Sequence, residues 1–437
     1  MLGLDEKTFR QVIQSASPFQ QTGRIQSVNG AITATLNGAI GELCQIKSRT
    51  GRLSLAEVIG FDGNLSQIMP FATNETLQRD DEVIGLGTSM RVPVGDGVLG
   101  RVINALGEPI DDLGPLATPL REPFNGDPPP TLGRQDITVP FITGQAAIDG
   151  LLTLGLGQRV GLFAGSGVGK STLLGQIARH ASADLNVVVL VGERGREVTP
   201  FVQQALGPQG LSRSVVIVAT ANESPLARVR SAETGMAIAG WFRRQGKNVL
   251  LMLDSLTRFA MAQRDLGLML GEPPTARGYT PSVFQKMAVL LERMGNADRG
   301  SVTGILTILV EGDDLNDPIA DSARSILDGH IVLSRKLANA GHFPSIDILA
   351  SNSRLFIELA DAVHQRDAVA VRQILTQYDE VVDLLQIGAY QRGVAERTDK
   401  AVDLYPAVCK FLQQELGVPQ PFALTKEKLR ELAGRWN

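Results

Sequence analysis

The chain has 437 residues, of which 43% are hydrophobic and 20% are charged, and this composition excludes a mainly disordered protein. At roughly 150 residues per domain, the length predicts about three domains. The formal charge of −4 provides no basic surface for nucleic acid, and two cysteines exclude both a dense disulfide framework and a Cys-rich metal site.

Residues 1–20 lack the basic and apolar regions of a signal peptide. No apolar run approaches the roughly 18 residues that a bilayer span requires. We therefore expect a cytoplasmic protein, which leaves docking on a membrane complex open. Residues 4–14 carry apolar side chains at helical spacing, although a frayed terminus explains this segment equally well.

Residues 21–90 form short runs in which apolar and polar side chains alternate, as in half-buried strands. Asn-Gly pairs at Asn29-Gly30 and Asn37-Gly38 are typical of tight hairpin turns. Closely spaced short strands of this kind predict a small β-barrel or sandwich.

Residues 91–352 begin with a Gly- and Pro-rich stretch and then alternate apolar runs with helical patterns. The apolar runs are rich in Val, Ile and Leu with little alternation, which is typical of parallel strands buried on both faces. Helices are expected over residues 171–181 and 224–245, so we predict an α/β domain with a parallel sheet. Its strands are expected at residues 159–164, 186–192, 214–220, 248–254, 304–311 and 329–335.

Residues 353–437 are dominated by apolar residues at three- and four-residue spacing. The pattern predicts helices over residues 354–365, 368–385 and 426–436. We expect these helices to form a separate C-terminal domain.

A glycine-rich loop lies between the predicted strand 159–164 and the predicted helix 171–181, which is the context that a phosphate-binding loop requires. Its backbone N–H groups and the helix N-terminus attract phosphate, its lysine can reach the β- and γ-phosphates, and its serine hydroxyl can bind Mg²⁺. An alanine replaces the usual first glycine, and its methyl group is small enough to be tolerated. The predicted nucleotide-binding residues are Ala164, Gly165, Ser166, Gly167, Val168, Gly169, Lys170, Ser171 and Thr172.

Asp254 ends a predicted strand in the run NVLLMLD. A strand-ending Asp often does no more than cap the following helix. With a phosphate loop upstream, we expect Asp254 to bind Mg²⁺, directly or through water, together with Ser171.

Hydrolysis of a nucleoside triphosphate also needs a group that orients or deprotonates the attacking water. Glu193 ends the run NVVVLVGE, at the carboxyl side of the sheet, where ligands bind in open α/β folds. Glu311 occupies another strand end, with Asp313 and Asp314 close behind. From the sequence pattern alone, either Glu193 or the carboxylates at Glu311, Asp313 and Asp314 could activate the water. Glu193 could also be an exposed residue that only forms a salt bridge.

Six motifs in one order carry a more specific resemblance, which covers residues 22–414. The chain resembles the protein-export ATPases of flagella and type III secretion systems, a family similar to the catalytic subunit of rotary ATP synthases. The motifs are AGSGVGKST, VGERGREV, LLMLDSLTRFA, GEPPTARGYTPSVF, EGDDLNDPIADSARSILDGHIVLSR and DILASNSR.

The resemblance implies a β-barrel domain at residues 21–90, a RecA-like P-loop ATPase core at residues 91–352 and a helical domain at residues 353–437. It implies a homohexamer that binds ATP and Mg²⁺ at subunit interfaces. Glu193 then becomes the general base, and Arg194 lies beside the γ-phosphate. Arg354 becomes an arginine finger that enters the neighbouring subunit's site, whereas the pattern alone favours a surface Arg.

The resemblance also places Phe343-Pro344 where the rotary catalytic subunits carry an aromatic residue against adenine. A core Phe is the alternative. Phe411 and Leu416 are candidates for a second adenine contact. Gln145 replaces an Arg that is common in related chains, and we expect it to affect packing more than chemistry.

By the same resemblance, the function is ATP hydrolysis that energises type III export. It releases substrates from chaperones and prepares them for the membrane export gate. The flagellar version is favoured over the injectisome version by DPIADSARSILDG. The implied partners are a stator-like regulator that binds residues 1–20, a central stalk protein, and export chaperones with their substrates. The implied location of this protein is the cytoplasm, at a peripheral site on the inner membrane. The alternatives are a subunit of an ion-translocating rotary ATPase, a nucleotide-binding subunit without turnover, and a ring helicase.

Overall fold

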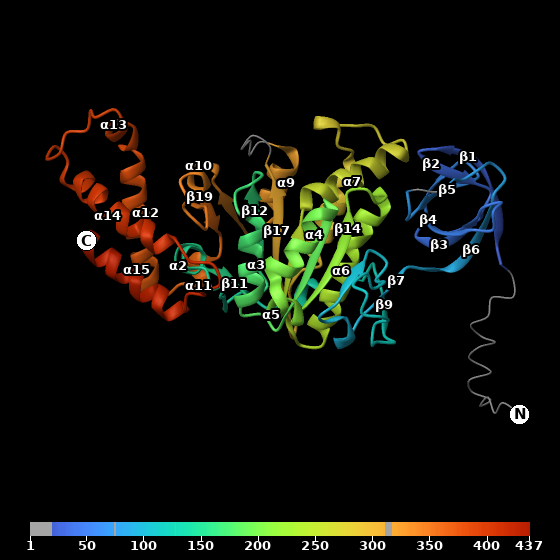
Figure 1. The fold of residues 1–437 in the computed structure, drawn as a ribbon, viewed down its shortest axis with the longest axis horizontal. Coiled ribbons are helices and arrows are strands. Elements are labelled where there is room, and N and C mark those ends of the chain that lie inside the picture. The colour runs from blue at the N-terminus through green and yellow to red at the C-terminus, as the bar shows by residue number, and fades with distance from the viewer. Residues whose placement is uncertain (1–19, 74–75, 127, 311–316) are drawn as a thin grey trace, which may run out of the picture.

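The computed structural model describes residues 20–73, 76–126, 128–310 and 317–437. Figure 1 shows a barrel, a central sheet and a group of helices that follow one another in chain order along the longest axis. The predicted N-terminal docking segment lies outside the described residues except for its last residue, as do Glu311, Asp313 and Asp314. None of the helices in the described ranges combines the length and apolar character of a bilayer span.

The predicted barrel is confirmed, and it is closed by six antiparallel strands. Ile25, Ile46, Ile68 and Val83 fill its interior with almost no exposed surface. Closure pairs every strand on both sides, which leaves the barrel no open edge. The strands are β1 (Thr22–Asn29), β2 (Ala31–Ala34), β3 (Glu42–Lys47), β4 (Leu53–Asp62), β5 (Leu65–Pro70) and β6 (Glu82–Ser89), in the order β1-β2-β5-β4-β3-β6.

The central sheet is mostly parallel, as the sequence predicts, and all six expected strands are present in it. Its main path is β19-β18-β12-β17-β15-β13-β14-β8, in which β19 alone runs antiparallel. The strands are β8 (Val102–Asn104), β12 (Arg159–Ala164), β13 (Leu185–Glu193), β14 (Ser214–Thr220), β15 (Asn248–Asp254), β16 (Gly295–Asn296), β17 (Ser301–Leu309), β18 (Gly329–Leu333) and β19 (Ile346–Ser353).

Helices cover both faces of this sheet, which explains why its strands do not alternate. In β13, Val187 and Val189 join the hydrophobic cluster of α6 (Pro225–Arg244) and α7 (Leu256–Met269). Val188 and Leu190, which point the other way, join the cluster of α3 (Lys170–His180). Every residue of β13 is buried as a result. Further helices near the sheet are α4 (Gly195–Pro200), a π-helix (Phe201–Leu206), α5 (Gly207–Ser212), α8 (Pro281–Glu292), α9 (Pro318–Ile326) and α10 (Arg335–Asn339).

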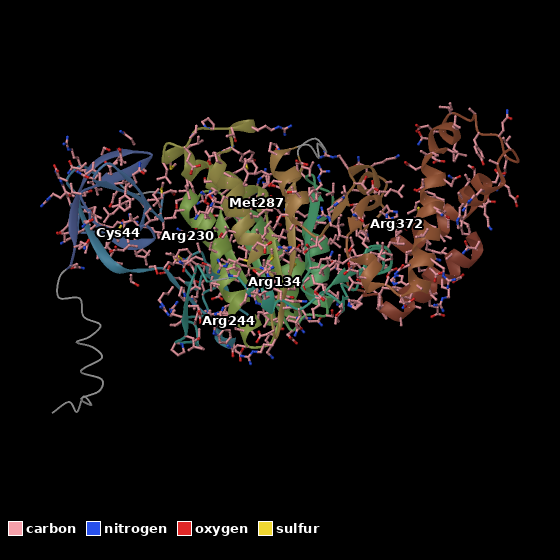
Figure 2. The ribbon with its side chains drawn as sticks, turned by 180° about the vertical axis from the view of Figure 1, so that it is seen from behind. Cys44, Arg134, Arg230, Arg244, Met287 and Arg372 are labelled. Carbon is pink, nitrogen blue, oxygen red and sulfur yellow. The ribbon has the colours of Figure 1, made fainter. Side chains whose placement is uncertain are left out.

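The C-terminal helices contact the edge of the central unit through Arg372. Its guanidinium donates hydrogen bonds to the carbonyls of Ile348 at 2.9 Å and Leu151 at 3.2 Å, so α12 (Ala362–Asp379) is attached to β19 and to α2 (Ala146–Leu151) (Figure 2). The residue limits assigned to the three domains stay predictions. The helices are α2 (Ala146–Leu151), α11 (Phe356–Leu359), α12 (Ala362–Asp379), α13 (Val382–Gln386), α14 (Glu396–Leu412) and α15 (Phe422–Trp436).

The barrel is tied to the core by a buried ion pair. Glu57 of β4 is fully buried, and its Oε2 accepts a hydrogen bond of 2.9 Å from Nε of Arg230 on α6 (Figure 2). Arg230 also contacts Glu233, and its guanidinium lies 4.4 Å from the centre of the Phe124 ring. The pair therefore joins the barrel to the central domain, with the Glu57 carboxylate out of reach of water.

Replacing Arg230 by Ala is expected to lower the free energy of unfolding by about 3–5 kcal/mol, because it leaves the Glu57 carboxylate buried and unpaired. Arg244→Ala is the matched control, since Arg244 and its partner Glu122 are partly exposed, and it should cost about 0–1 kcal/mol. Denaturant unfolding of both variants checks this. Equal losses in the two variants would contradict the structural role of the Glu57 pair.

Candidate nucleotide site

The phosphate loop connects the carboxyl end of β12 to the first turn of α3. Gly167 and Gly169 have φ angles of +78° and +85°, values that side chains rarely allow. Gly169 caps α3, so Lys170 begins the helix. The chain thus presents the helix N-terminus and the free amides of the turn, which is the arrangement that attracts phosphate.

Lys170 contacts two carboxylates at the ends of neighbouring strands. Its Nζ lies 2.5 Å from Oδ1 of Asp254 on β15 and 3.7 Å from Oε1 of Glu193 on β13. The parallel register pairs Leu190 with Asp254, which brings the two carboxylates to the same end of the sheet. Thr307 of β17 donates a 2.7 Å hydrogen bond to Asp254 Oδ1. The structure therefore brings together the three side chains predicted from three separate motifs.

Glu193 is buried among charges of both signs. Burial raises the pKa of its carboxyl, the neighbouring Asp254 raises it further, and Lys170 and Arg258 oppose this effect. Nη2 of Arg258 lies 3.5 Å from Glu193 Oε1, and Oε1 has no hydrogen-bond donor of its own in the described structure. A buried carboxylate whose pKa is raised, and whose Oε1 is near two cations but accepts no hydrogen bond, has the properties of a proton acceptor.

Ser171 and Asp254 offer the ligands that Mg²⁺ prefers, because both present oxygen atoms. Ser171 is exposed and follows Lys170 directly, while Asp254 is 3% exposed and contacts Lys170. The two oxygen-bearing side chains would suit a magnesium ion, which would take its other ligands from substrate phosphates and water. Their role as metal ligands stays a prediction.

Arg194 does not contact the Lys170 cluster. Its side chain is 62% exposed and pairs with Glu197 at 3.6 Å, at the start of α4. The predicted contact of Arg194 with the γ-phosphate stays a prediction.

Arg354 lies at the opposite end of the sheet from the phosphate loop. Its amide donates to the carbonyl of Asp328, whose carboxylate in turn accepts from the amide of Arg159, the first residue of β12. The phosphate loop follows the last residue of β12, which puts the two ends about 20 Å apart at the usual rise per strand residue. Arg354 is exposed, and its guanidinium donates to the carbonyl of Arg324. Arg354 therefore lies away from the phosphate loop of its own chain, and its role as an arginine finger stays a prediction.

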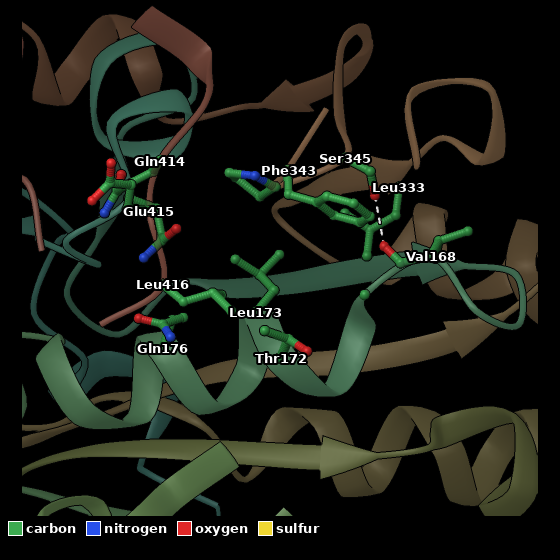
Figure 3. Close-up of a pocket in the computed structure, with 13 residues that line it drawn as sticks. Val168, Thr172, Leu173, Gln176, Leu333, Phe343, Ser345, Gln414, Glu415 and Leu416 are labelled. Atoms are coloured by element: carbon green, nitrogen blue, oxygen red, sulfur yellow. Dashed lines mark hydrogen bonds between the residues drawn. The ribbon is translucent and has the colours of Figure 1, made fainter. Parts of the chain in front are cut away.

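A cavity of about 270 Å³ lies beside the phosphate loop, between α3, the Phe343 segment and the chain after α14 (Figure 3). Phe343 is 43% exposed, and a Cβ at position 169 would come within 3.4 Å of its ring. The ring of Phe343 is therefore directly next to the phosphate loop. The other residues that line the cavity are Gln145, Val168, Thr172, Leu173, Gln176, Leu333, Pro344, Ser345, Gln414, Glu415 and Leu416.

Of the two candidates for a second adenine contact, the structure brings only Leu416 to this cavity. Leu416 lines it and is 69% exposed. Phe411 is 8% exposed and packs against Gly150, where an added Cβ would lie 3.1 Å from its ring. Phe411 belongs to the core between α14 and α2 and does not line this cavity, and an adenine contact for either residue stays a prediction. Gln145 is buried and lines the cavity.

Sequence reasoning missed two residues of the site. Arg258, one turn into α7, pairs with Glu193 and also donates to the carbonyl of Gly192. The motif LLMLDSLTRFA contains it, and a cation one turn after a strand-ending Asp is a usable signal. Gln414 bridges several segments around the cavity, and no pattern in the sequence distinguishes it from neighbouring polar residues.

Comparisons with known proteins identify the two larger parts of the chain. Residues 144–353 match the ATP synthase alpha/beta family, nucleotide-binding domain, and residues 360–431 match the T3SS EscN ATPase C-terminal domain. The chain is 46% identical over 425 residues to the flagellum-specific ATP synthase of Treponema pallidum (strain Nichols), covering 97% of this chain and 95% of that protein. It is 45% identical over 412 residues to the type 3 secretion system ATPase of Xanthomonas euvesicatoria, covering 94% and 93%.

Solved structures agree with this assignment. The assembled ATPase EscN from the type III secretion system of enteropathogenic E. coli superposes with a TM-score of 0.89 at 44% identity, covering 94% of this chain and 100% of EscN. EscN in complex with its central stalk EscO gives a TM-score of 0.86 at 42% identity, with the same coverage. Because both curated relatives and both solved structures match nearly their whole length, this chain belongs to the family of flagellum-specific and type III secretion system ATPases.

Proposed function

We propose that this protein is an Mg²⁺-dependent ATPase that energises type III protein export. The observation that carries the proposal is the cluster of Lys170, Asp254 and Glu193 beside a phosphate loop. The family supplies the biological context, because its curated members are named for flagella and for type III secretion.

Each side chain of the cluster has a distinct role in the proposed mechanism. Lys170 and the loop amides bind the β- and γ-phosphates of ATP. Ser171 and Asp254 hold Mg²⁺, which neutralises phosphate charge when it is bound. Glu193 accepts a proton from the water that attacks the γ-phosphorus, and ADP leaves from the opposite side. Phe343 and Pro344 receive the adenine, since they line the cavity next to the loop.

Arg354 completes the site from the neighbouring subunit of a homohexamer. Its place at the far end of the sheet supports action in trans, and the solved relative EscN is described as assembled. A guanidinium that enters the neighbour's site stabilises charge on the transferring phosphoryl group. Arg194, which starts α4 beside Glu193, is proposed to reach the γ-phosphate once ATP replaces its contact with Glu197.

The proposed partners follow the family. A central stalk protein is supported by the complex of EscN with EscO. We further propose a stator-like regulator that binds residues 1–20, export chaperones with their substrates, and the membrane export gate. The protein then works in the cytoplasm as a peripheral ring at the inner membrane. It releases substrates from chaperones and prepares them for the gate.

We favour the flagellar system, on the stretch DPIADSARSILDG, although relatives from both systems match equally well. A subunit of an ion-translocating rotary ATPase is the second candidate, because residues 144–353 match the ATP synthase family. The match of residues 360–431 to the EscN C-terminal domain favours export over ion pumping.

The purified protein is expected to release phosphate from ATP in the presence of Mg²⁺ and to stop when the metal is chelated. Lys170→Ala should remove this activity. The substitution removes the cation that contacts both Asp254 and Glu193 and that binds the γ-phosphate in the proposed mechanism. Lys428→Ala is the control, since Lys428 is exposed on α15. A phosphate-release assay with all three proteins tests the proposal, and normal turnover by Lys170→Ala would contradict it.

A further inference from the structure

We propose that Asp328 and Gln158 are positioning residues for Arg354, so that each subunit holds the guanidinium it supplies to its neighbour through the strand that leads to its own phosphate loop. The inference rests on the proposed function, in which Arg354 completes the neighbouring site. It concerns the end of the sheet opposite the phosphate loop, where the first residues of β12 and β18 meet the last residue of β19.

The main chain of Arg354 is attached to the segment that begins β18. Its amide donates to the carbonyl of Asp328 at 3.0 Å, and its Nη2 donates to the carbonyl of Arg324 at 2.8 Å. β18 and β19 also lie very close together here, because a Cβ added at Gly329 would be 2.7 Å from the backbone oxygen of Asn352. A shift of Asp328 therefore moves the backbone from which the exposed side chain of Arg354 projects.

The carboxylate of Asp328 attaches this segment to β12. Its Oδ2 accepts from the amide and from Nε of Arg159, at 3.0 and 3.1 Å, and its Oδ1 accepts from Nη2 at 3.1 Å. The amide of Asp328 donates in return to the carbonyl of Arg159 at 2.9 Å. Nη1 of Arg159 donates to Glu292 of α8 at 2.6 Å, which engages the guanidinium from a second side. A bidentate contact of this kind fixes geometry as well as charge, so Asp328 follows any displacement of β12.

The fully buried side chain of Gln158 makes a second attachment at the same place. Its Nε2 donates to the carbonyl of Asp328 at 3.0 Å and to Oγ of Ser353 at 3.2 Å, and its Oε1 accepts from the amide of Gly155 at 2.7 Å. Oγ of Ser353 donates onward to the carbonyl of Thr153 at 3.1 Å. Both amide protons of Gln158 therefore bind the residue before the predicted finger and the carbonyl that receives the amide of that finger.

The junction formed by Gln158, Arg159 and Asp328 lies away from the Lys170 cluster, because the length of β12 separates them. We therefore expect the junction to influence turnover through Arg354 and not through the nucleotide site of its own subunit. A reacting group that is displaced by about 1 Å can lose about 10²-fold in rate, so a loosened junction should show in kcat.

Asp328→Asn keeps the shape of the side chain and removes the charge that pairs with Arg159. On the full chain, kcat for MgATP is expected to fall by about 10–10²-fold, while KM stays near the parent value because the variant's own phosphate loop and base cavity are untouched. Asp403→Asn is the matched control, since it breaks an exposed contact with Arg392 and should leave both constants unchanged. A rise in KM without a fall in kcat would overturn the inference.

Ser353→Ala tests the same junction with a smaller change, which keeps the inference open to refutation if Asp328→Asn does not fold. It removes the hydroxyl that accepts from Gln158, and kcat should again fall at constant KM. Arg354→Ala separates this inference from the function on which it rests. Unchanged kcat in Arg354→Ala would contradict the proposed role of the finger, whereas a loss there together with parent kcat in Asp328→Asn and Ser353→Ala contradicts only the positioning.

Mixed rings show in whose site Asp328 acts. A subunit with Asp328→Asn keeps Glu193, and a subunit with Glu193→Gln keeps the intact junction with Arg354. In an equal mixture, about one interface in four joins an intact Glu193 to a correctly held Arg354, so phosphate release should approach about a quarter of the parent rate. Mixed rings no more active than the average of the two variants would place the effect in the subunit that carries Asp328→Asn and overturn the inference.

Discussion

Glu193→Gln is expected to bind ATP with nearly the parent affinity while phosphate release falls by about 10²–10⁴-fold, the usual loss when a general base is removed. The substitution preserves size, and it leaves the 2.5 Å contact between Lys170 and Asp254 available. The amide of Gln, unlike a carboxylate, does not accept a proton from water. Equilibrium binding of a fluorescent ATP analogue and a phosphate-release assay measure the two effects separately.

The pH profile provides a second signature of Glu193. Burial and Asp254 raise the pKa of Glu193, so the parent enzyme should gain activity as pH rises through this elevated pKa and the carboxylate ionises. This rise of activity with pH should be missing from the residual activity of Glu193→Gln. Glu380→Gln, which changes an exposed carboxylate at the end of α12, should keep both the parent rate and the rise with pH. Undiminished turnover in Glu193→Gln would exclude Glu193 as the base.

Arg354→Ala is expected to lower kcat by roughly 10³-fold or more, as other arginine fingers do, without weakening ATP binding comparably. The variant leaves the Lys170 cluster of its own subunit intact, because Arg354 lies at the opposite end of β12. If the finger acts in trans, each variant supplies what the other lacks. The Arg354→Ala subunit carries Glu193, and the Glu193→Gln subunit carries Arg354.

Mixing the two inactive variants should therefore restore activity. In an equal mixture of a head-to-tail ring, about one interface in four joins an intact Glu193 to an intact Arg354. Phosphate release by mixed rings, with mixing confirmed by two different affinity tags, measures the rescue. Rings of either variant alone provide the baseline. Mixed rings that stay as inactive as this baseline would show that Arg354 does not act across the interface.

The central sheet was predictable because its strands are buried on both faces. In β13, nine consecutive residues are buried, and a run of Val and Leu of this length has few alternatives to an inner strand. The strand ends then indicate where the site lies, because parallel strands bring their carboxyl ends to one edge of the sheet. This places Glu193 and Asp254 near the phosphate loop, as the local patterns indicated.

Contacts between distant segments were not predictable in the same way. Phe411 and Leu416 are five positions apart, yet α14 turns Phe411 into the core against Gly150 and ends before Leu416. Helical spacing does not reveal which partner a face will meet. Gln414 has the same limitation, because its bonds to Gly144 and Ala146 depend on packing between segments about 270 residues apart.

The chain between α14 and α15 is one wall of the base cavity, and this has a thermodynamic consequence. Gln414 and Gly417 attach that wall to the Gly144 turn and to Gln176 of α3. A protein that binds the C-terminal helices and displaces this segment changes the affinity for nucleotide. By linkage, nucleotide must change the affinity for that protein by the same factor. Nucleotide binding and partner binding are then thermodynamically coupled, and a measurement of either affinity reports on the other.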